Sequence, residues 1–583
     1  MSQVPLSTIL RHPLASKRCM MIFNANGEET TEIFELLSRY EAVGPIGQGT
    51  YGFVCSARDN DLVESFQIDP PVEYEDPSLS LEDREEMYDS ATLVAVKKLR
   101  QLFEHNQPRM WLCATREIQL MMAFQHDNVI SATDFFIPLG GVEMMTYESI
   151  LNLQCTFDSV YVVMKKMDYT LREVLDSMEV TAAELDPQYA AMWRRLTALV
   201  KSVEESSTAE NNDDTNNVVE KRGERKRSNM TSTSPDGATE SIKTPTATED
   251  MSPLARTAGE DELHVEPAPP PDGVPLGGSV CCPLTGLRLH PLSKDYRKFI
   301  LYQIFRGVGY LHLCPVIHRD LKPENIMLDR SYGTRITDFG QGRDVGLNTA
   351  ADYEQTMLDN CTQWYAAPET LTVAINSPVG FIDHESFHGV DVWSIGCLAA
   401  EMLIGRPLFY TTAMSGKAQL LSIYRVLGEP SAAAINSIAD YRDKDTKELF
   451  ISSVHKLVKT APPTTALDFG LEELLRSPFG DEDEDEIQLI IDCLRWDPRD
   501  RVTIQAALRN PYFTKDKYDP TIDPDDTAKR VPSVRPEDIS EPVSGRAFLW
   551  NLFLERHPEV GELWNSLVAK HEKEVKAAAA AST

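Results

Sequence analysis

The stretch Val316–Gly340, VIHRDLKPENIMLDRSYGTRITDFG, constrains the chain most, because it fixes the spacing of several polar side chains. Asp320 stands five residues before Asn325 and eighteen before Asp338. Asn325 and Asp338 supply the oxygen ligands that Mg²⁺ prefers, and Asp320 can accept the proton of an attacking hydroxyl. Lys322 can neutralise charge that builds up on a transferred group. A capping aspartate in a loop would explain either tripeptide, HRD at 318–320 or DFG at 338–340, if it stood alone. The spacing of the two together indicates phosphoryl transfer from a nucleotide.

This stretch resembles the catalytic and metal-binding loops of eukaryotic protein kinases, because HRDLKPEN and DFG are both intact. Lys322 resembles the serine/threonine branch of that family more than the tyrosine branch. The resemblance implies an α+β, bilobal protein kinase fold, with an antiparallel β N-lobe, one regulatory helix and a mainly α C-lobe. It also implies ATP and Mg²⁺ as cofactors between the lobes, and Ser or Thr of a protein as the phosphate acceptor.

Net charge and cysteine spacing indicate which class of partner and which cellular compartment to expect. The 583-residue chain carries a net charge of −33, which disfavours nucleic acid or an anionic membrane and favours basic proteins or peptides as partners. Its ten cysteines form no CxxC pair, which fits a reduced cytoplasmic or nuclear setting better than disulfides or a zinc site. No apolar run approaches the roughly 20 residues of a membrane helix.

The motif spacing predicts one kinase domain with flanking extensions. The first 27 residues carry three basic side chains and no acid, as a transit peptide does, but their composition favours a disordered leader. The expected boundaries are 1–37 for an N-terminal extension, 38–515 for the kinase domain with its N-lobe at about 40–164 and its C-lobe at about 165–515, and 516–583 for a docking-site-like, helical extension.

Three insertions are expected, at about 57–90, 140–156 and 178–290. The first is acidic and contains proline, which indicates a solvated segment between two strands. The third is polar with almost no aromatic residues, so it is predicted to be largely disordered. Its basic cluster at 221–227, KRGERKR, is either a nuclear import patch or a solvated charge run. A shorter acidic run at 481–486 is expected to be an exposed helix start.

A GxGxxG motif lies in the run EAVGPIGQGTYGFVCSA at 41–57, which alternates like a strand, turns and alternates again. Strand pattern follows the motif, so a dinucleotide-binding helix is disfavoured and a hairpin lying over phosphates is favoured. By resemblance, Met164 lies at the back of an adenine pocket and residues 165–167 form its hinge. The predicted ATP-binding residues are Ile46, Gly47, Gln48, Gly49, Thr50, Tyr51, Gly52, Val54, Ala95, Lys97, Met164 and Met167.

Lys97 comes near the end of the apolar run LVAVKK, where a lysine is costly unless it is paired or reaches water. Because VAVK matches the kinase pattern VAIK, Lys97 and not Lys98 is expected to face the α- and β-phosphates. Glu117, in the helix-patterned run that follows, stands where kinases carry the glutamate that orients this lysine.

The second half of the domain also resembles a kinase. Residues 296–312 have helical spacing and lead into the catalytic loop, and residues 390–403 are predicted to form a buried helix that bears Asp391. Glu369 closes the activation segment in an APE motif, and Arg501 matches the arginine that pairs with it in kinases. Removing either partner of such a buried pair is expected to cost about 3–5 kcal/mol.

Two runs, GRPLF at 405–409 and VLGEPS at 426–431, are similar to sequences of the mitogen-activated protein kinases, a proline-directed group. Asp519 and Asp523 resemble that group's acidic docking site for basic partner motifs, and 548–557 resembles an extension that packs back on the kinase core. The resemblance implies protein substrates and an upstream activating kinase.

The activation segment departs from that group. Its TxY phosphorylation motif falls on Met357-Leu358-Asp359, which carries neither acceptor. The two arginines that hold the phosphotyrosine fall on Gln363 and Ala366. Without an arginine at 366, a strict preference for proline after the acceptor is in doubt.

The clasp for a phosphothreonine is retained by resemblance, as Arg116, Arg319 and Arg343. Three guanidinium groups that converge should surround an anion, and phosphorylated Thr356 is the predicted one. Thr362 is retained as the expected catalytic-loop partner of Asp320 and Lys322. The alternatives to Thr356 are the constitutive acids Asp352 and Glu354.

Three functions remain open at this point. An active protein serine/threonine kinase is favoured, because Lys97, Glu117, Asp320, Asn325 and Asp338 are all present. A pseudokinase acting as a signalling scaffold is the main alternative, supported by the altered activation segment. A small-molecule kinase is disfavoured, since the APE motif and Thr362 serve protein substrates.

Overall fold

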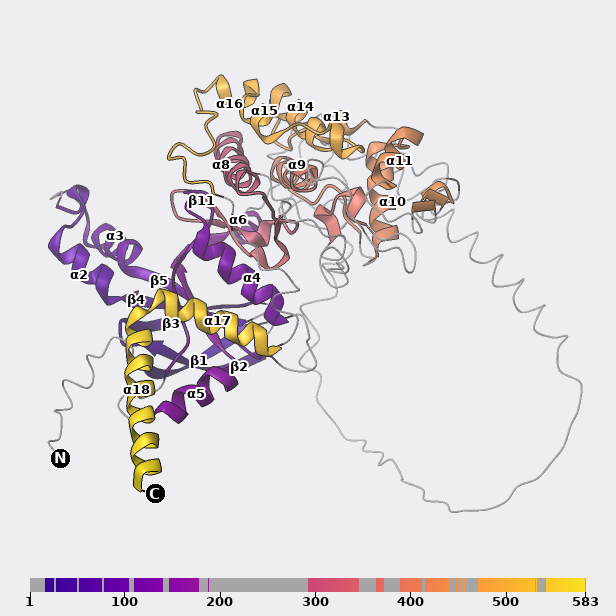
Figure 1. The fold of residues 1–583 in the computed structure, drawn as a ribbon. Helices are drawn as coiled ribbons and strands as arrows, with labels where there is room; N and C mark the ends of the chain where they lie inside the picture. The colour runs from indigo at the N-terminus through magenta and orange to yellow at the C-terminus, as the bar shows by residue number, and fades with distance from the viewer. Residues whose placement is uncertain are drawn as a thin grey trace, which may run out of the picture.

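The computed structural model describes residues 16–25, 28–49, 52–75, 78–103, 110–139, 146–177, 292–344, 363–371, 388–411, 415–439, 470–529 and 542–581, together with a few isolated positions between 187 and 531. Within these residues, an antiparallel sheet region is followed by a mostly helical region (Figure 1). The mixed α and β content predicted from the sequence is therefore confirmed.

A five-stranded antiparallel sheet carries the glycine-rich hairpin, which closes where Gly49 and Gly52 are register partners. The last two strands in the sheet order are apolar along most of their length, because both of their faces are covered. In sheet order, the strands are β3 (Tyr40–Gly49), β4 (Gly52–Asp59), β5 (Leu93–Leu99), β7 (Val160–Lys165) and β6 (Ala132–Phe136).

The N-terminal segment corrects one expectation. Residues 16–37 form a hairpin of β1 (Ser16–Ala25) and β2 (Glu28–Leu37), so the disordered leader expected for the first 27 residues is wrong from Ser16 onward. Phe23 and Phe34 are buried, and the Phe23 ring lies 4.8 Å from that of Phe53 in the sheet. The apolar run at 19–23 lets β1 bury Met21 and Phe23 on one face, which offsets the cost of ordering the segment.

The acidic insertion at 57–90 lies between β4 and β5, but it is mostly helical. It forms α2 (Asn60–Ile68), η1 (Val72–Glu75) and α3 (Leu81–Thr92). Its acidic residues are largely exposed, and Phe66 packs edge-on against Tyr74 and Tyr88. The second insertion likewise contains a helix, α5 (Tyr147–Thr156), whereas the third lies outside the described residues except for Pro187.

The helical region is built around α8 and α9, which pack against each other. All but the first residue of α9 are buried, because its sequence is apolar nearly all round. The described part contains no helix that is both long and apolar enough to cross a membrane. The helices beyond the sheet are α4 (Met110–Ala123), α6 (Leu171–Ser177), α8 (Lys294–Leu313), α9 (His388–Ile404), α10 (Gly416–Leu427), α11 (Ala432–Ala439), α13 (Leu471–Leu474), α14 (Glu484–Cys493), α15 (Ile504–Leu508), α16 (Pro511–Thr514), α17 (Pro542–Arg556) and α18 (Pro558–Ala581).

Short strands and 3₁₀ helices lie in the segments that connect these helices. Strands β8, β10 and β11 make one small sheet, and β9 pairs with β12. The bounds are β8 (Tyr169–Thr170), β9 (Val316–Ile317), β10 (Ile326–Leu328), β11 (Thr334–Ile336) and β12 (Arg343–Asp344) for the strands, and η4 (Pro323–Asn325), η5 (Phe339–Gln341), η7 (Gln363–Tyr365), η8 (Pro368–Thr370) and η10 (Pro498–Asp500) for the 3₁₀ helices.

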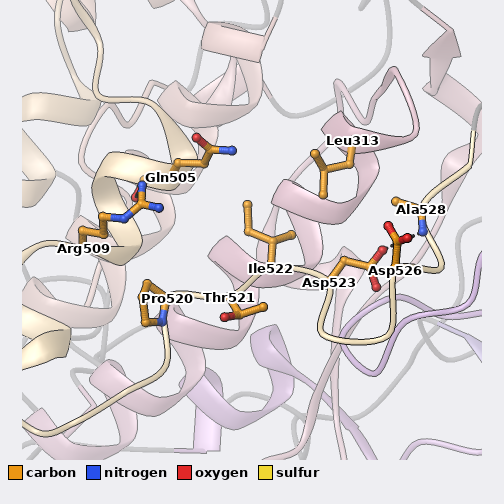
Figure 2. Close-up of a pocket in the computed structure, with 9 residues that line it drawn as sticks. All are labelled: Leu313, Gln505, Arg509, Pro520, Thr521, Ile522, Asp523, Asp526 and Ala528. Carbon is orange, nitrogen blue, oxygen red and sulfur yellow. Dashed lines mark hydrogen bonds between the residues drawn. The ribbon is translucent and has the colours of Figure 1, made fainter.

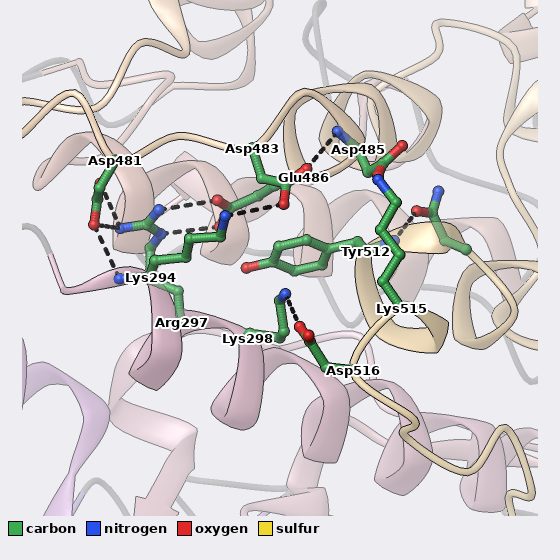
Figure 3. Close-up of polar contacts among 11 residues, drawn as sticks. Lys294, Arg297, Lys298, Asp481, Asp483, Asp485, Glu486, Tyr512, Lys515 and Asp516 are labelled. Atoms are coloured by element: carbon green, nitrogen blue, oxygen red, sulfur yellow. Dashed lines mark hydrogen bonds and ion pairs between the residues drawn. The ribbon is translucent and has the colours of Figure 1, made fainter.

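A charged cluster joins the start of α8 to α14 and α16 (Figure 3). Arg297 is fully buried and forms two 2.9 Å hydrogen bonds to the carboxylate of Glu486, which is 1% exposed. The acidic run at 481–486 does begin a helix, with Asp483 as its N-cap. The prediction that this run is exposed holds only for Glu484; the other acids are partly buried, and Glu486 is fully buried because a buried arginine far along the chain requires a buried partner.

The C-terminal helices pack back on the sheet region. Helix α17 lies against α4 and α5, and α18 continues along α5 (Figure 1). Leu549, Trp550 and Phe553 are buried there, which confirms the expectation that residues 548–557 return to the core. Beyond them, the Trp564 ring stacks on Tyr147 of α5 at 5.3 Å.

His557 ties the end of α17 to β6, because its Nε2 atom lies 3.1 Å from Asp134 Oδ1. Burial lowers the pKa of His557, but the hydrogen bond and charge of Asp134 outweigh it and leave the pKa above its ordinary value. Because its folded-state pKa is raised, protonated His557 stabilises the fold fully when the pH is below its unfolded-state pKa. That stabilisation is lost as the pH rises through its folded-state pKa.

We therefore expect the stability advantage of the wild-type protein over His557→Gln to be larger at about pH 6 than at about pH 9. Urea unfolding of both proteins at the two pH values measures this difference. An advantage that is constant or grows with pH would contradict the assignment of a charged His557.

Candidate active site

The catalytic loop brings Asp320, Lys322 and Asn325 together. Lys322 Nζ lies 2.7 Å from Asp320 Oδ2, and Asn325 Nδ2 donates to the Asp320 carbonyl at 2.7 Å and to its carboxylate at 3.0 Å. Burial raises the pKa of Asp320, although the Lys322 ammonium opposes that rise. The Asp320 carboxylate is thus oriented by two donors and is more basic than an exposed carboxylate.

Asp391 holds this loop from behind. Its carboxylate accepts hydrogen bonds from the backbone N–H groups of His318 and Arg319, both at 2.8 Å. The His312 Nε2 atom lies 3.0 Å from the same carboxylate. Burial alone would raise the pKa of Asp391, but these hydrogen bonds hold it below its ordinary value. Arg319 has a φ of +70°, a strained conformation that such anchoring supports.

Lys97 on β5 points to α4, where its Nζ lies 2.6 Å from Glu117 Oε1. Burial lowers the pKa of Lys97, but Glu117 and then Asp338 raise it above its ordinary value. Lys98 points to the other face of the strand and pairs with Glu32 of β2 at 2.6 Å. The choice of Lys97 over Lys98 for the pair with Glu117 is therefore confirmed.

Asp338 adopts a φ of +64° at the start of η5, and its carboxylate accepts from the N–H of Gly340. Its charge acts on both Lys97 and Asp320, raising the pKa of each. Asp338 is therefore near enough to both Lys97 and Asp320 for its charge to act on each. Asn325 and Asp338 together supply the oxygen donors that a Mg²⁺ ion would need.

The register of the sheet places the predicted nucleotide residues side by side. Gly47 pairs with Val54, and Val54 pairs with Lys97 in the next strand. Gly52 must be glycine, because a Cβ atom there would lie 1.9 Å from the Lys98 carbonyl oxygen. Ala95 and Met164, also predicted, are register partners on β5 and β7. Of the other predicted residues, Met167 is buried, Ile46 is exposed, and Gln48 and Gly49 lie at the hairpin tip. Thr50 and Tyr51 lie outside the described residues.

Residues 284–513 match the family model of the protein kinase domain. The match supports a protein kinase, and therefore a phosphotransferase. It contains Asp320, Asn325 and Asp338, whereas Lys97 and Glu117 lie outside the matched range. Protein kinase domains generally use ATP and Mg²⁺, and the donors around Asp338 and Lys97 fit that pair of cofactors.

The APE segment is fixed by the predicted ion pair. Arg501 forms hydrogen bonds of 2.6 and 2.8 Å to the two oxygens of Glu369, and both side chains are almost completely buried. The Arg501 Nη1 atom also donates to the Gly389 carbonyl at 2.7 Å, at the start of α9. The segment is thereby held against the buried helix.

The predicted regulatory arginines lie in three separate segments. Arg116 lies on α4, Arg319 immediately precedes Asp320, and Arg343 lies on β12, opposite Ile317 of β9. Arg343 donates to the Gly342 carbonyl at 2.7 Å. Their proposed ligand Thr356, and the predicted catalytic Thr362, lie outside the described residues.

The two predicted docking aspartates lie in the turn that follows α16. Asp519 accepts from the N–H and hydroxyl of Thr521, and its carbonyl accepts from Tyr302 of α8 at 2.8 Å. Asp523 accepts from the N–H of Ala528 and faces a pocket that Asp526 also lines (Figure 2). Both carboxylates therefore also stabilise their own loop.

Sequence reasoning missed one polar network beside the catalytic loop. Arg172 of α6 lies 2.9 Å from Glu401 Oε1, and the Tyr365 hydroxyl donates to the other oxygen of Glu401 at 2.6 Å. Arg172 also approaches Glu324, inside HRDLKPEN, at 3.2 Å. The one available signal was a glutamate within the apolar run of α9, since a buried acid requires a partner.

Proposed function

We propose that the chain is an ATP- and Mg²⁺-dependent protein serine/threonine kinase that resembles the mitogen-activated protein kinases. The observation that carries this proposal is the joint placement of Asp320, with its two donors, and Asp338, whose charge acts on Lys97. Two lobes, the sheet region and the helical region, would hold the nucleotide between them. Substrates would be proteins, and basic docking motifs would bind near Asp519 and Asp523.

In this mechanism, Mg²⁺-bound ATP supplies the γ-phosphoryl group. Lys97, held by Glu117, orients the phosphates, while the backbone of the β3–β4 hairpin covers them without Cβ atoms in the way. Asn325 and Asp338 would hold the metal. Asp320 accepts the proton of the substrate hydroxyl, and Lys322 offsets the charge on the transferred group, so catalysis is mainly positioning and charge neutralisation.

The preference for Ser or Thr is supported by Lys322 beside Asp320, and a protein substrate is supported by the APE segment anchored to Arg501. Kinship with the mitogen-activated protein kinases is supported by the 405–409 and 426–431 runs and by the return of α17 to α4. Preference for proline after the acceptor is proposed as relaxed, because position 366 is alanine. A reduced cytoplasmic or nuclear setting suits the free thiols.

Phosphate transfer from MgATP to a basic generic protein tests this proposal, and the chain offers a matched pair of variants. Lys97→Met should abolish measurable transfer, because the phosphates lose their orienting charge, whereas Lys98→Met should retain it, because Lys98 faces β2. Equal transfer by both variants would reject the assigned site. Binding of ATP without any transfer by the wild type would favour the scaffold alternative.

We also propose that phosphorylation of Thr356 activates the enzyme by placing an anion among Arg116, Arg319 and Arg343. Thr356→Ala should then reduce phosphate transfer. Thr356→Glu places a negative charge where the phosphate would be and should restore part of that transfer. Phosphosite mapping on the active enzyme is the accompanying measurement. Unchanged activity in Thr356→Ala, with no phosphate found between Gly340 and Pro368, would eliminate this mechanism.

A further inference from the structure

A pocket of about 590 Å³ lies behind the catalytic loop, between the end of α8, the start of α9, η10 and α15. Sites for small ligands typically enclose about 300–1,000 Å³, so this volume suffices for a compound of one or two rings. We call it the rear pocket. Its walls include Leu313, His388, Val392, Thr503, Ile504 and Ile522.

One wall of the rear pocket is a pair of parallel imidazole rings. The rings of His312 and His388 are stacked with centroids 4.0 Å apart and an interplanar angle of 9°. Burial, followed by the neighbouring His312, lowers the pKa of His388 to about 3, so this ring is neutral at physiological pH. The flat, neutral ring of His388 favours stacking by another flat ring.

The charges at the rear pocket are already balanced. Arg501 is neutralised by Glu369, and Arg499 is paired with Asp497 at 3.0 Å. No carboxylate lines the pocket among the described residues. Because both lining arginines are paired and no described carboxylate lines the pocket, an uncharged ligand is favoured.

Two features of the rear pocket bear on its ligand. Leu313 is 45% exposed and also borders the adjacent pocket of about 450 Å³ shown in Figure 2. The His388 Nε2 atom is buried and has no hydrogen-bond partner within the described part of the chain. A flat ring would cover Leu313, and a hydroxyl group on it would hydrogen-bond to His388 Nε2 once the imidazole turns toward the pocket.

The rear pocket is one side chain away from the catalytic loop. His312 contacts Asp391, and Asp391 holds the backbone N–H of Arg319, the residue before the base. We propose that the rear pocket binds an uncharged compound with one or two flat rings and a hydroxyl group. Occupancy displaces the His312–Asp391 contact and slows catalysis, an effect that rests on the kinase activity proposed above.

Titration of the full chain with 2-naphthol, an uncharged two-ring alcohol, tests the site. We expect saturable 1:1 binding by fluorescence, with shifts of the His312 and His388 ring signals in NMR spectra. Gln505→Trp, an exposed substitution that fills the rim, should weaken binding by about tenfold or more. Ala506→Trp, on the same helix but outside the pocket lining, should bind as the wild type does.

Absence of saturable binding, equal affinity in Gln505→Trp, or displacement of 2-naphthol by a non-hydrolysable ATP analogue would overturn the site. Phosphate transfer is then followed with and without 2-naphthol. Reduced transfer in the wild type but not in Gln505→Trp supports the link to the loop, and unchanged transfer at saturation overturns it. If no transfer occurs at all, the proposed function fails while the binding result still decides the site.

Discussion

Replacing Asp320 by asparagine should slow phosphate transfer by about 10²- to 10⁴-fold, because the amide cannot accept the proton of the substrate hydroxyl. The change should leave the loop in place. The Asn325 side chain also donates to the backbone carbonyl of residue 320 at 2.7 Å, and that bond does not depend on the carboxylate. Nucleotide affinity should therefore remain close to that of the wild type, and the loss should be in kcat.

The matched control is Asp295→Asn, which removes one exposed carboxylate at the start of α8. It changes the net charge by the same amount and should not alter transfer. Single-turnover rates with MgATP and a basic protein, together with nucleotide binding, separate chemistry from binding. Transfer by Asp320→Asn at the wild-type rate would show that another group is the base, or that the observed activity comes from a contaminant.

The catalytic contacts were predictable because they are carried by short motifs. Asp320, Lys322 and Asn325 lie within six consecutive residues, so their spacing nearly determines their geometry. Lys97 was distinguishable from Lys98 because alternate residues of a strand face opposite sides. The strand pattern around the GxGxxG motif likewise predicted the hairpin that the β3–β4 register shows.

The contacts that sequence reasoning missed join distant parts of the chain. Arg297 and Glu486 are 189 residues apart, and His557 lies 422 residues from the Phe135 carbonyl that it also contacts. Nothing in the local pattern distinguishes the buried Glu486 from its more accessible acidic neighbours, because burial there depends on how α8 and α14 pack. The β1–β2 hairpin was missed for a different reason: the apolar run at 19–23 is short and continuous, so it lacks the alternation that identifies a half-buried strand.

Arg501→Ala should destabilise the fold by about 3–5 kcal/mol, because it leaves the Glu369 carboxylate buried without a counter-charge. Arg501 also donates hydrogen bonds to the carbonyls of Gly389, at the start of α9, and Arg495, just after α14, so the backbone at both places loses partners as well. The contrast is Arg499→Ala. That arginine is paired with Asp497 but is 54% exposed, and its loss should cost about 0–1 kcal/mol.

A double replacement distinguishes a buried charge from lost packing. If the cost of Arg501→Ala comes mainly from the unpaired carboxylate, adding Glu369→Leu should recover part of it, since a buried pair replaced by apolar groups is often nearly neutral. Urea unfolding of the two single variants and the double variant measures the coupling. Strictly additive losses would mean that the guanidinium acts through Gly389 and the face of Trp393, 5.0 Å away, and that its charge on Glu369 contributes little. We expect the coupling to dominate, because both oxygens of Glu369 are bonded to the same guanidinium.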